Sequence, residues 1–258
     1  MIYGLPYQGS KNKLAEDIIF ALPPARRFVD LFGGGGAIIH RAFLSRKYDA
    51  FLYNDISPLT VEYFRRAVSE PPISPRSVNF ISREAFFRLR DKNGFVRFMW
   101  SFGSNGEDYA FSPENERIAR HAFYHYPNGG RSEIHLRLKR FNNFPRFPCV
   151  ISNISYFDYV YREGDLVYCD IPYENTGKDC TVYGGKFNTA EFYKWARTRP
   201  FPVFFSSYDI SAKDFPILFE KRIISTLSRY NNCEKIERLY ANAAGADIGI
   251  NKQLTFWG

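Results

Sequence analysis

The sequence predicts an α/β fold in which a mostly parallel sheet carries an inserted, mainly helical segment. Two observations support this prediction: strand-like apolar runs alternate with helical runs in both end regions, and a basic, aromatic segment interrupts them. Strands that alternate with helices pair in parallel, because each helix returns the chain to the same edge of the sheet. With 258 residues, 45% of them apolar, the chain can bury a large core, which excludes a disordered chain and a disulfide miniprotein.

The first 70 residues predict alternating helices and strands. Residues 10–22 predict a helix that ends at Pro23-Pro24, and residues 27–32 then predict a short buried strand. Four glycines follow directly. The next predicted elements are a helix over 37–46, a strand over 50–53 that leads into Asn54-Asp55, and a helix over 59–68 capped by Ser57 with Pro58 at its first position.

A change of composition at residue 73 predicts an insertion. Residues 73–149 hold 13 Lys and Arg against 7 Asp and Glu, a net charge of +6, together with 15 aromatic residues. We therefore divide the chain into an α/β domain, residues 1–72 and 150–258, and an inserted helical subdomain, residues 73–149. The helices predicted within the insertion cover residues 82–92, 95–102, 113–124 and 131–141.

After the insertion the α/β pattern resumes. Strands are predicted over 150–154, 165–170 and 202–206, with a helix over 189–197. Residues 235–240 and 253–257 are strand-like runs joined by a connection rich in glycine and alanine. They predict an antiparallel hairpin that closes one edge of the sheet.

A glycine loop and two aspartates mark a candidate ligand site. Asp30 ends the first strand just before Gly33-Gly34-Gly35-Gly36, and Asp55 ends the second. Ligands of open α/β sheets bind at such strand ends, and an acid at the second strand end suits the hydroxyls of a ribose. The fingerprints of dinucleotide and phosphate loops are both missing. A nucleoside without phosphates therefore fits, and S-adenosylmethionine is such a cofactor; a flexible glycine turn with a solvated aspartate is the alternative.

The tetrapeptide Asp170-Ile171-Pro172-Tyr173 follows another predicted strand and suits chemistry on an exocyclic amine. The lone pair of such an amine is delocalised into the ring, and two acceptors on its hydrogens would free it to attack a sulfonium methyl. The Asp170 carboxylate and the Ile171 carbonyl can be these acceptors, while Tyr173 offers a stacking face for a flipped base. Catalysis would then depend on positioning and electrostatics.

Three further motifs complete an ordered set with the glycine loop and the Asp170 loop: Tyr7-Gln8-Gly9-Ser10-Lys11, Asn54-Asp55 and Ile154-Ser155-Tyr156-Phe157-Asp158. This set, over most of the chain, resembles the Dam-like DNA adenine N6-methyltransferases of the alpha group, found in bacteria and their phages. The resemblance implies a Rossmann-like class I methyltransferase fold with an antiparallel edge strand. The residues it assigns to S-adenosylmethionine are Tyr7, Gly9, Lys11, Asp30, Phe32, Gly33, Gly34, Asp55, Tyr156, Asp158 and Asp170.

The resemblance also implies the reaction and the role of the insertion. The enzyme would flip an adenine out of double-stranded DNA at a specific sequence and methylate its N6 amine, with Asp170, Ile171, Pro172 and Tyr173 as the catalytic loop. Ile171 replaces the first proline of the family's loop. The insertion would be the target recognition domain, and we expect DNA contacts from Ser104, Asn105, Arg117, Arg120, Arg131, Arg137, Lys139 and Arg140.

Rival functions and partners follow from the same residues. An RNA or a protein amide also presents a planar amine, and Ile171 raises the alternative of an inactive homologue that binds DNA or cofactor only. The net charge of +8 favours a polyanionic partner. We expect a monomer that needs no metal, since the four cysteines show no zinc spacing, and a cytoplasmic protein without leader or membrane span. A cognate restriction endonuclease is a partner that the sequence leaves open.

Overall fold

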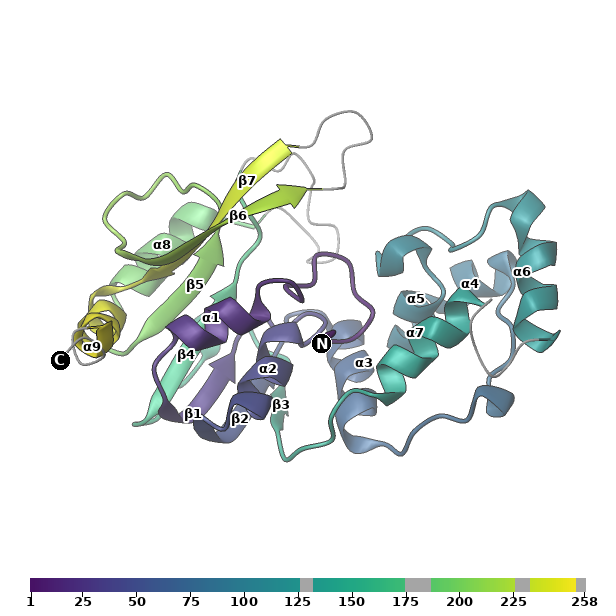
Figure 1. The fold of residues 1–258 in the computed structure, drawn as a ribbon, viewed down its shortest axis with the longest axis horizontal. Coiled ribbons are helices and arrows are strands. Elements are labelled where there is room, and N and C mark those ends of the chain that lie inside the picture. Colours follow the sequence, from purple (N-terminus) through teal and green to yellow (C-terminus); the bar gives the residue numbers. More distant parts are fainter. Residues whose placement is uncertain (126–131, 175–186, 226–232, 254–258) are drawn as a thin grey trace.

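A computed structural model describes residues 1–125, 132–174, 187–225 and 233–253. Its centre is a seven-stranded sheet in the order β3-β2-β1-β4-β5-β7-β6 (Figure 1). The first five strands in this order run parallel, and β7 and β6 are antiparallel additions at one edge. The strands are β1 (Ala25–Asp30), β2 (Tyr48–Asn54), β3 (Val150–Ser152), β4 (Asp165–Asp170), β5 (Val203–Ser207), β6 (Ile217–Ser225) and β7 (Cys233–Ala241).

Helices cover both faces of the sheet, because the central strands are apolar on both sides. Phe28 and Tyr168 face one apolar cluster, while their neighbours Val29 and Cys169 face the other. The first cluster includes side chains of α1 (Ala15–Ala21), α2 (Ala37–Ser45) and α3 (Pro58–Ser69), and the second those of α8 (Thr189–Arg197). The expected fold class, a mostly parallel α/β sheet with an antiparallel edge, is confirmed.

The capping signals near the start of the chain have the expected effect. Ser57 precedes α3, and its hydroxyl accepts a hydrogen bond from the backbone N–H of Thr60 at 3.3 Å, with Pro58 at the first helical position. Gly36 precedes α2 with a φ of 67°, a conformation that suits glycine. The turn between β1 and α2 is therefore fixed by local sequence.

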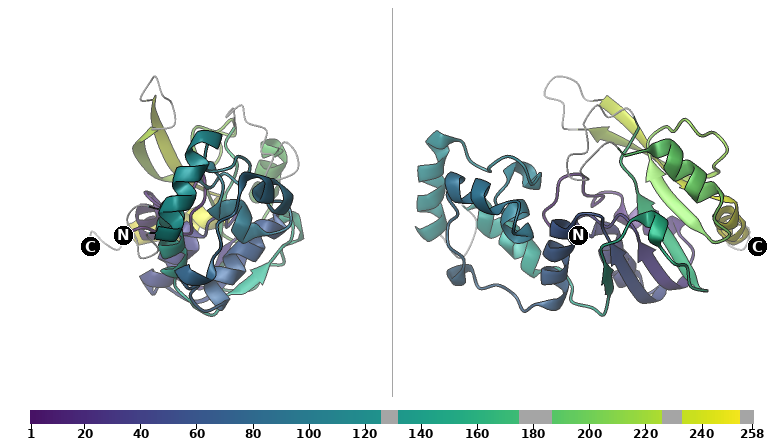
Figure 2. Two further views of the ribbon diagram at one scale, coloured as in Figure 1. Left: turned by 90° about the vertical axis from the view of Figure 1, so that its right-hand side faces the viewer. Right: turned by 180° about the vertical axis from the view of Figure 1, so that it is seen from behind.

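Helices α4 (Arg83–Leu89), α5 (Gly94–Met99), α6 (Pro113–His125) and α7 (Glu133–Asn142) gather at one end of the molecule, beyond α3 (Figures 1 and 2). Aromatic side chains join this group to the rest of the fold. The ring of Tyr63 on α3 lies 5.1 Å from that of Phe98 and 5.2 Å from that of Phe141. The helical segment is thus fixed to α3 by a shared apolar core, to which many of its aromatic residues belong.

The predicted hairpin at the end of the chain is wrong. The hairpin consists of β6, which the sequence analysis missed, and β7, while residues 243–253 form helix α9 (Ala243–Gln253) instead of leading into a strand. Asn242 starts this helix: its Oδ1 accepts the backbone N–H of Gly245 at 2.9 Å. An asparagine cap before an alanine-rich run stabilises a helix, so Asn242 was a local signal for α9. Residues 254–257 of the predicted strand lie outside the described residues.

Candidate active site at the carboxyl ends of the strands

Two adjoining cavities lie where β1, β2 and β4 end. One, of about 290 Å³, is lined by the N-terminal loop with Tyr7 and Lys11, the glycine loop and the Asp170 loop. The other, of about 250 Å³, is lined by Asn54, Tyr156 and the start of α8. Phe32 lines both, so the two cavities adjoin at the carboxyl edge of the sheet, and we refer to them together as the cleft. This is the edge at which open α/β folds bind ligands.

The glycine loop makes room for two aromatic side chains of the protein itself. A Cβ on Gly33 would lie 2.2 Å from the ring of Tyr53, and one on Gly35 would lie 2.5 Å from the Cβ of Tyr7. The Tyr53 hydroxyl donates to the Gly34 carbonyl at 2.7 Å. Larger residues would push Tyr53 and Tyr7 away, so the glycines allow these rings to hold the loop in place.

Asp30 is buried at the end of β1 with an unsatisfied oxygen. Its exposed fraction is 1%, and its Oδ1 has no hydrogen-bond partner among the described residues. Burial, together with the carboxylates of Asp170 and Asp55, raises the pKa of Asp30 well above its usual value. A buried acceptor of this kind, in the lining of the cavity, suits an ammonium group of a ligand.

Asp55 is completely buried at the end of β2. Its two carboxylate oxygens accept backbone N–H groups, Oδ2 from Gly34 at 3.0 Å and Oδ1 from Ser57 at 2.8 Å. Burial raises the pKa of Asp55 to about 6, and the two N–H groups oppose the shift. The carboxylate therefore ties the glycine loop to the start of α3, and a ribose would have to share its oxygens with these backbone groups.

Asp170, at the end of β4, is held through a single oxygen. Its Oδ1 lies 2.7 Å from the Lys11 ammonium and accepts the Ser206 hydroxyl at 3.2 Å. The Ser206 hydroxyl is in turn 2.7 Å from that of Tyr168. Within the described part of the chain Oδ2 has no hydrogen-bond partner, and the side chain is 23% exposed. Asp170 thus combines a fixed orientation with an acceptor that no donor of the described residues occupies.

The Lys11 ammonium joins the N-terminal loop to two other parts of the fold. Besides Asp170 it contacts Glu237 on β7 at 3.2 Å and the hydroxyl of Tyr173. Burial alone would lower the pKa of Lys11, but the carboxylates of Asp170 and Glu237 raise it. Lys11 is therefore placed at the catalytic loop, although the resemblance assigned it to the cofactor.

Glu237 is the site residue that sequence reasoning missed. It is 1% exposed, and both of its carboxylate oxygens accept the Tyr173 hydroxyl, at 3.1 and 3.0 Å. A signal was available: Glu237 shares a strand face with the buried Leu239 and Ala241, where an acid requires a partner. That partner could not be identified from the strand pattern alone.

Tyr173 and Tyr208 form a stacked pair beside Asp170. Their ring centroids are 4.0 Å apart with an interplanar angle of 24°, and the Lys235 ammonium lies 4.7 Å from the centre of the Tyr208 ring. Ile171 is 2% exposed and packs in the apolar cluster that contains Phe192. The residue that replaces the family's proline is therefore held by burial.

The second cavity contains Tyr156 but not Asp158. The ring of Tyr156 lies 5.5 Å from that of Phe32, and both line the cavity with Phe187. Asp158 is exposed and does not belong to this lining, whereas Glu191 at the start of α8 does. Of the residues expected at the adenine of a cofactor, the structure thus brings Tyr156 to the cleft and leaves Asp158 outside its lining.

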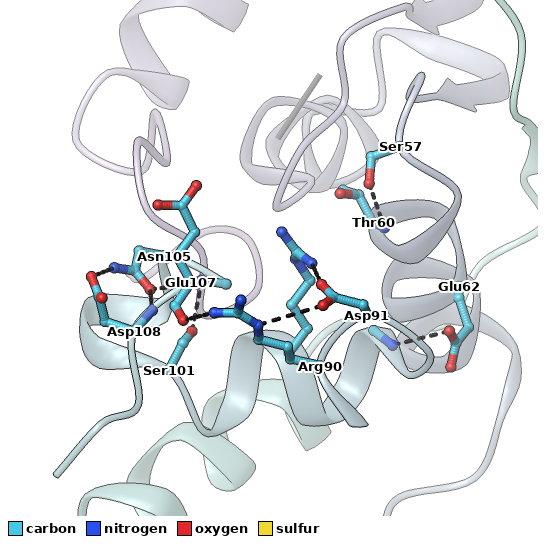
Figure 3. A network of polar contacts seen from close by, with 12 residues as sticks. Ser57, Thr60, Glu62, Arg90, Asp91, Ser101, Asn105, Glu107 and Asp108 are labelled. Carbon is cyan, nitrogen blue, oxygen red and sulfur yellow. Dashed lines mark hydrogen bonds and ion pairs between the residues drawn. The ribbon is translucent and has the colours of Figure 1, made fainter. Parts of the chain in front are cut away.

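The loop over residues 101–108 is held by polar contacts (Figure 3). Arg90 donates to the Glu107 carbonyl, and the Asn105 side chain bonds Asp108 and the backbone N–H of Glu107. On the other side Arg137, 9% exposed, donates to the carbonyls of Met99 and Ser101 at 2.9 and 2.6 Å. The loop is thus rigidly supported from within the helical segment.

The same loop reaches the N-terminal loop. The backbone N–H of Gln8 donates to the Ser104 carbonyl at 3.1 Å, and Phe102, two residues earlier, is 64% exposed. Ser104 is itself buried, with a φ of 57°. The loop therefore presents an exposed phenyl ring close to the chain that lines the cleft.

The residues expected at DNA fall into two groups. Arg117, Arg120 and Lys139 are exposed. In contrast Arg137 and Asn105 bond the loop, and Arg140 donates to the carbonyls of Gly4 and Tyr3 at 2.9 and 3.0 Å. These contacts favour a structural role for the second group. Arg131 lies outside the described residues.

Comparison with known proteins supports the expected family. Residues 7–126, a little under half of the chain, match the family model of the D12 class N6 adenine-specific DNA methyltransferases. This match supports the Dam-like family and, with it, the enzyme class of that family, DNA adenine methyltransferase. The matched residues of the methyltransferase include Lys11, the glycine loop and Asp55, while the loop at 170–173 lies beyond them.

Two solved structures of the rRNA methyltransferase aviRa from Streptomyces viridochromogenes, at 1.5 and 2.4 Å, are similar to this chain. Their TM-scores are 0.43 and 0.41, with 15% and 16% sequence identity. The alignments cover 94% and 92% of this chain and 89% and 87% of the other. Likeness at this level says nothing about the substrate of the methyltransferase. Where its structure is described, it has neither a helix able to cross a membrane nor a group of three or more potential metal ligands.

Proposed function

We propose that this chain uses S-adenosylmethionine to methylate the N6 amine of an adenine flipped out of double-stranded DNA. The observation that carries the proposal is the state of Asp170. Its Oδ1 is held by Lys11 and Ser206, while Oδ2 has no partner among the described residues and borders a cleft wide enough for ligands. A fixed acceptor beside a stacked tyrosine pair suits the recognition of a flipped base.

The residues of the cleft fit the cofactor. Its ammonium would pair with the unsatisfied Oδ1 of Asp30, and its adenine would lie against Tyr156 in the second cavity. The ribose between them would share the oxygens of Asp55. Glu191, which lines that cavity, is better placed for the adenine amino group than Asp158, which does not line it. When bound, S-adenosylmethionine supplies an electrophilic methyl group.

The catalytic loop would orient and activate the amine. Asp170 Oδ2 would accept one N–H of the adenine and the Ile171 carbonyl the other, which localises the lone pair on nitrogen. The Tyr173–Tyr208 pair would provide the aromatic surface for the base. The proton released from the amine would pass by way of Asp170 Oδ2, and the 23% exposure of the Asp170 side chain allows its transfer to water.

The helical segment would supply the DNA surface. We propose residues 73–149 as the recognition subdomain and residues 1–72 and 150–258 as the catalytic domain. The exposed Phe102 would face the duplex beside the cleft, and Arg117, Arg120 and Lys139 would face phosphates. One chain contributes Lys11, Asp170 and both cavities, which supports a monomeric enzyme.

The test is single-molecule sequencing of plasmid DNA from a methylation-free host that expresses the protein or its Asp170→Ala variant. A sequence motif that carries N6-methyladenine only with the intact protein is the expected result, and it also identifies the recognition sequence. Unmodified DNA from cells with folded, cofactor-binding protein would overturn the proposal. Nucleoside analysis of total RNA from the same cells would then distinguish an RNA enzyme from an inactive binder.

A further inference from the structure

Glu237 reaches the catalytic loop because of the register of β7. Ser207, the last residue of β5, pairs with Arg238, so Glu237 lies one residue past the carboxyl end of that strand. Ser206 of β5 pairs in turn with Asp170. The antiparallel strand therefore extends over the edge where the cleft opens, and it brings an acid from the end of the chain to a site formed by its beginning and middle.

The contacts of Glu237 connect it to both Lys11 and Tyr173, which also contact each other. An ammonium has three N–H donors, and those of Lys11 have three acceptors: Asp170, Glu237 and the Tyr173 hydroxyl. The Tyr173 hydroxyl accepts from Lys11 and donates to Glu237. Each of these groups therefore fixes the other two, which limits the positions that both Lys11 and the Tyr173 ring can adopt.

The carboxylate of Glu237 also changes the electrostatics of the Lys11–Asp170 ion pair. Lys11 carries one positive charge against the carboxylates of Asp170 and Glu237. Burial raises the pKa of Glu237, Lys11 opposes that shift, and Asp170 adds to it. A second carboxylate that shares the lysine weakens its hold on Asp170, and so keeps electron density on Asp170 for an incoming amine.

We propose that Glu237 is a positioning residue for methyl transfer, and this inference rests on the proposed function. It acts through two neighbours: it fixes the Tyr173 ring by the hydroxyl, and it divides the charge of Lys11 between two acids. The β6–β7 hairpin is then part of the active site as well as the edge of the sheet.

The test compares Glu237→Gln with Glu220→Gln. Glu237→Gln keeps the shape of the side chain and removes its charge. Glu220→Gln is the control, because Glu220 lies on the neighbouring strand β6, is 59% exposed and pairs with Arg238. We would measure the single-turnover rate of methyl transfer to the mapped DNA site, the affinities for S-adenosylmethionine and for DNA, and the melting temperature. For Glu237→Gln we expect the single-turnover rate to fall by up to about 100-fold, because the reacting groups would be misplaced. Both affinities should stay within about twofold of wild type. Glu220→Gln should match wild type.

A double variant separates positioning from mere packing. If Glu237 acts through Tyr173, Tyr173→Phe combined with Glu237→Gln should lose less than the product of the two single losses. A wild-type rate for Glu237→Gln, fully multiplicative losses in the double variant, or a glutamine variant that fails to fold would each overturn the inference. An inactive wild-type protein would instead count against the proposed function, so the two failures are distinguishable.

Discussion

The cleft and the 101–108 loop both hold buried charges, but they use them differently. In the cleft the Lys11 ammonium faces two carboxylates, and the Oδ2 of Asp170 has no described partner. At the loop the Arg137 guanidinium donates to two backbone carbonyls, and Arg90 bonds a third. The first arrangement keeps an acceptor available for chemistry, whereas the second satisfies backbone groups and fixes a shape.

The difference shows why the charge of a segment does not identify the charges that face a partner. Residues 73–149 carry a net +6, and that excess predicted a surface for DNA. Yet Arg137 and Arg140, two of the expected contacts, bond main-chain carbonyls. The exposed side chains of Arg117, Arg120 and Lys139, on α6 and α7, can still contact phosphates.

The largest effect is expected from Asp170→Ala. Without the fixed acceptor, the amine lone pair remains delocalised, and we expect methyl transfer to fall by about 10²- to 10³-fold. Single-turnover assays on the mapped site measure this, with the exposed Asp49→Asn as control. A loss of less than tenfold would contradict the assigned role.

Lys11→Met should lower the rate and change its pH dependence. Removing a charge-assisted hydrogen bond costs about 1.5–3 kcal/mol, which corresponds to a rate loss of about ten- to a hundredfold. Lys11 opposes the rise that burial and the Asp170 carboxylate cause in the pKa of Glu237, so without the ammonium the pKa of Glu237 rises further and this acid is charged only at higher pH. Activity of the variant should recover as pH rises, whereas an unchanged pH profile would contradict the charge argument.

Arg137→Met tests whether the loop is held by structure or by DNA. The buried carbonyls of Met99 and Ser101 lose their hydrogen bonds from Arg137, and Ser101 keeps only the one from the Ser104 N–H among the described residues. We expect the free energy of unfolding to fall by about 1–3 kcal/mol in urea titrations. Lys139→Met, exposed on the same helix, should change stability by less than about 0.5 kcal/mol. The salt dependence of DNA binding should weaken only for Lys139→Met, because a lost phosphate contact releases fewer counterions.

The smallest effect is expected from Phe102→Ala. An exposed ring at the loop contributes little to stability, but loss of contact with the bases should weaken DNA affinity by about 1 kcal/mol. Phe20→Ala, on an exposed residue of α1, is the matched control. Equal DNA affinities for both variants would remove Phe102 from the interface.

Local signals predicted the parts of the fold and site that depend on neighbouring residues. Ser57 and Pro58 start α3, the predicted limits of α8 match the structure, and Asp170 ends β4. The contacts made by Glu237 and Arg137 could not be predicted in this way. The position of Glu237 depends on the pairing of β7 with β5, and the burial of Arg137 depends on a loop more than 30 residues earlier in the chain.

The link between Lys11 and Glu237 also has a consequence for the order in which the site is completed. Lys11 comes near the start of the chain and Glu237 near its end, so their contact forms only after most of the protein has been synthesised and β7 has joined the sheet. Contacts between such distant residues are the slow ones in folding. A nascent chain can thus build its glycine loop and its Asp170 strand while Lys11 and Tyr173 still lack their common anchor.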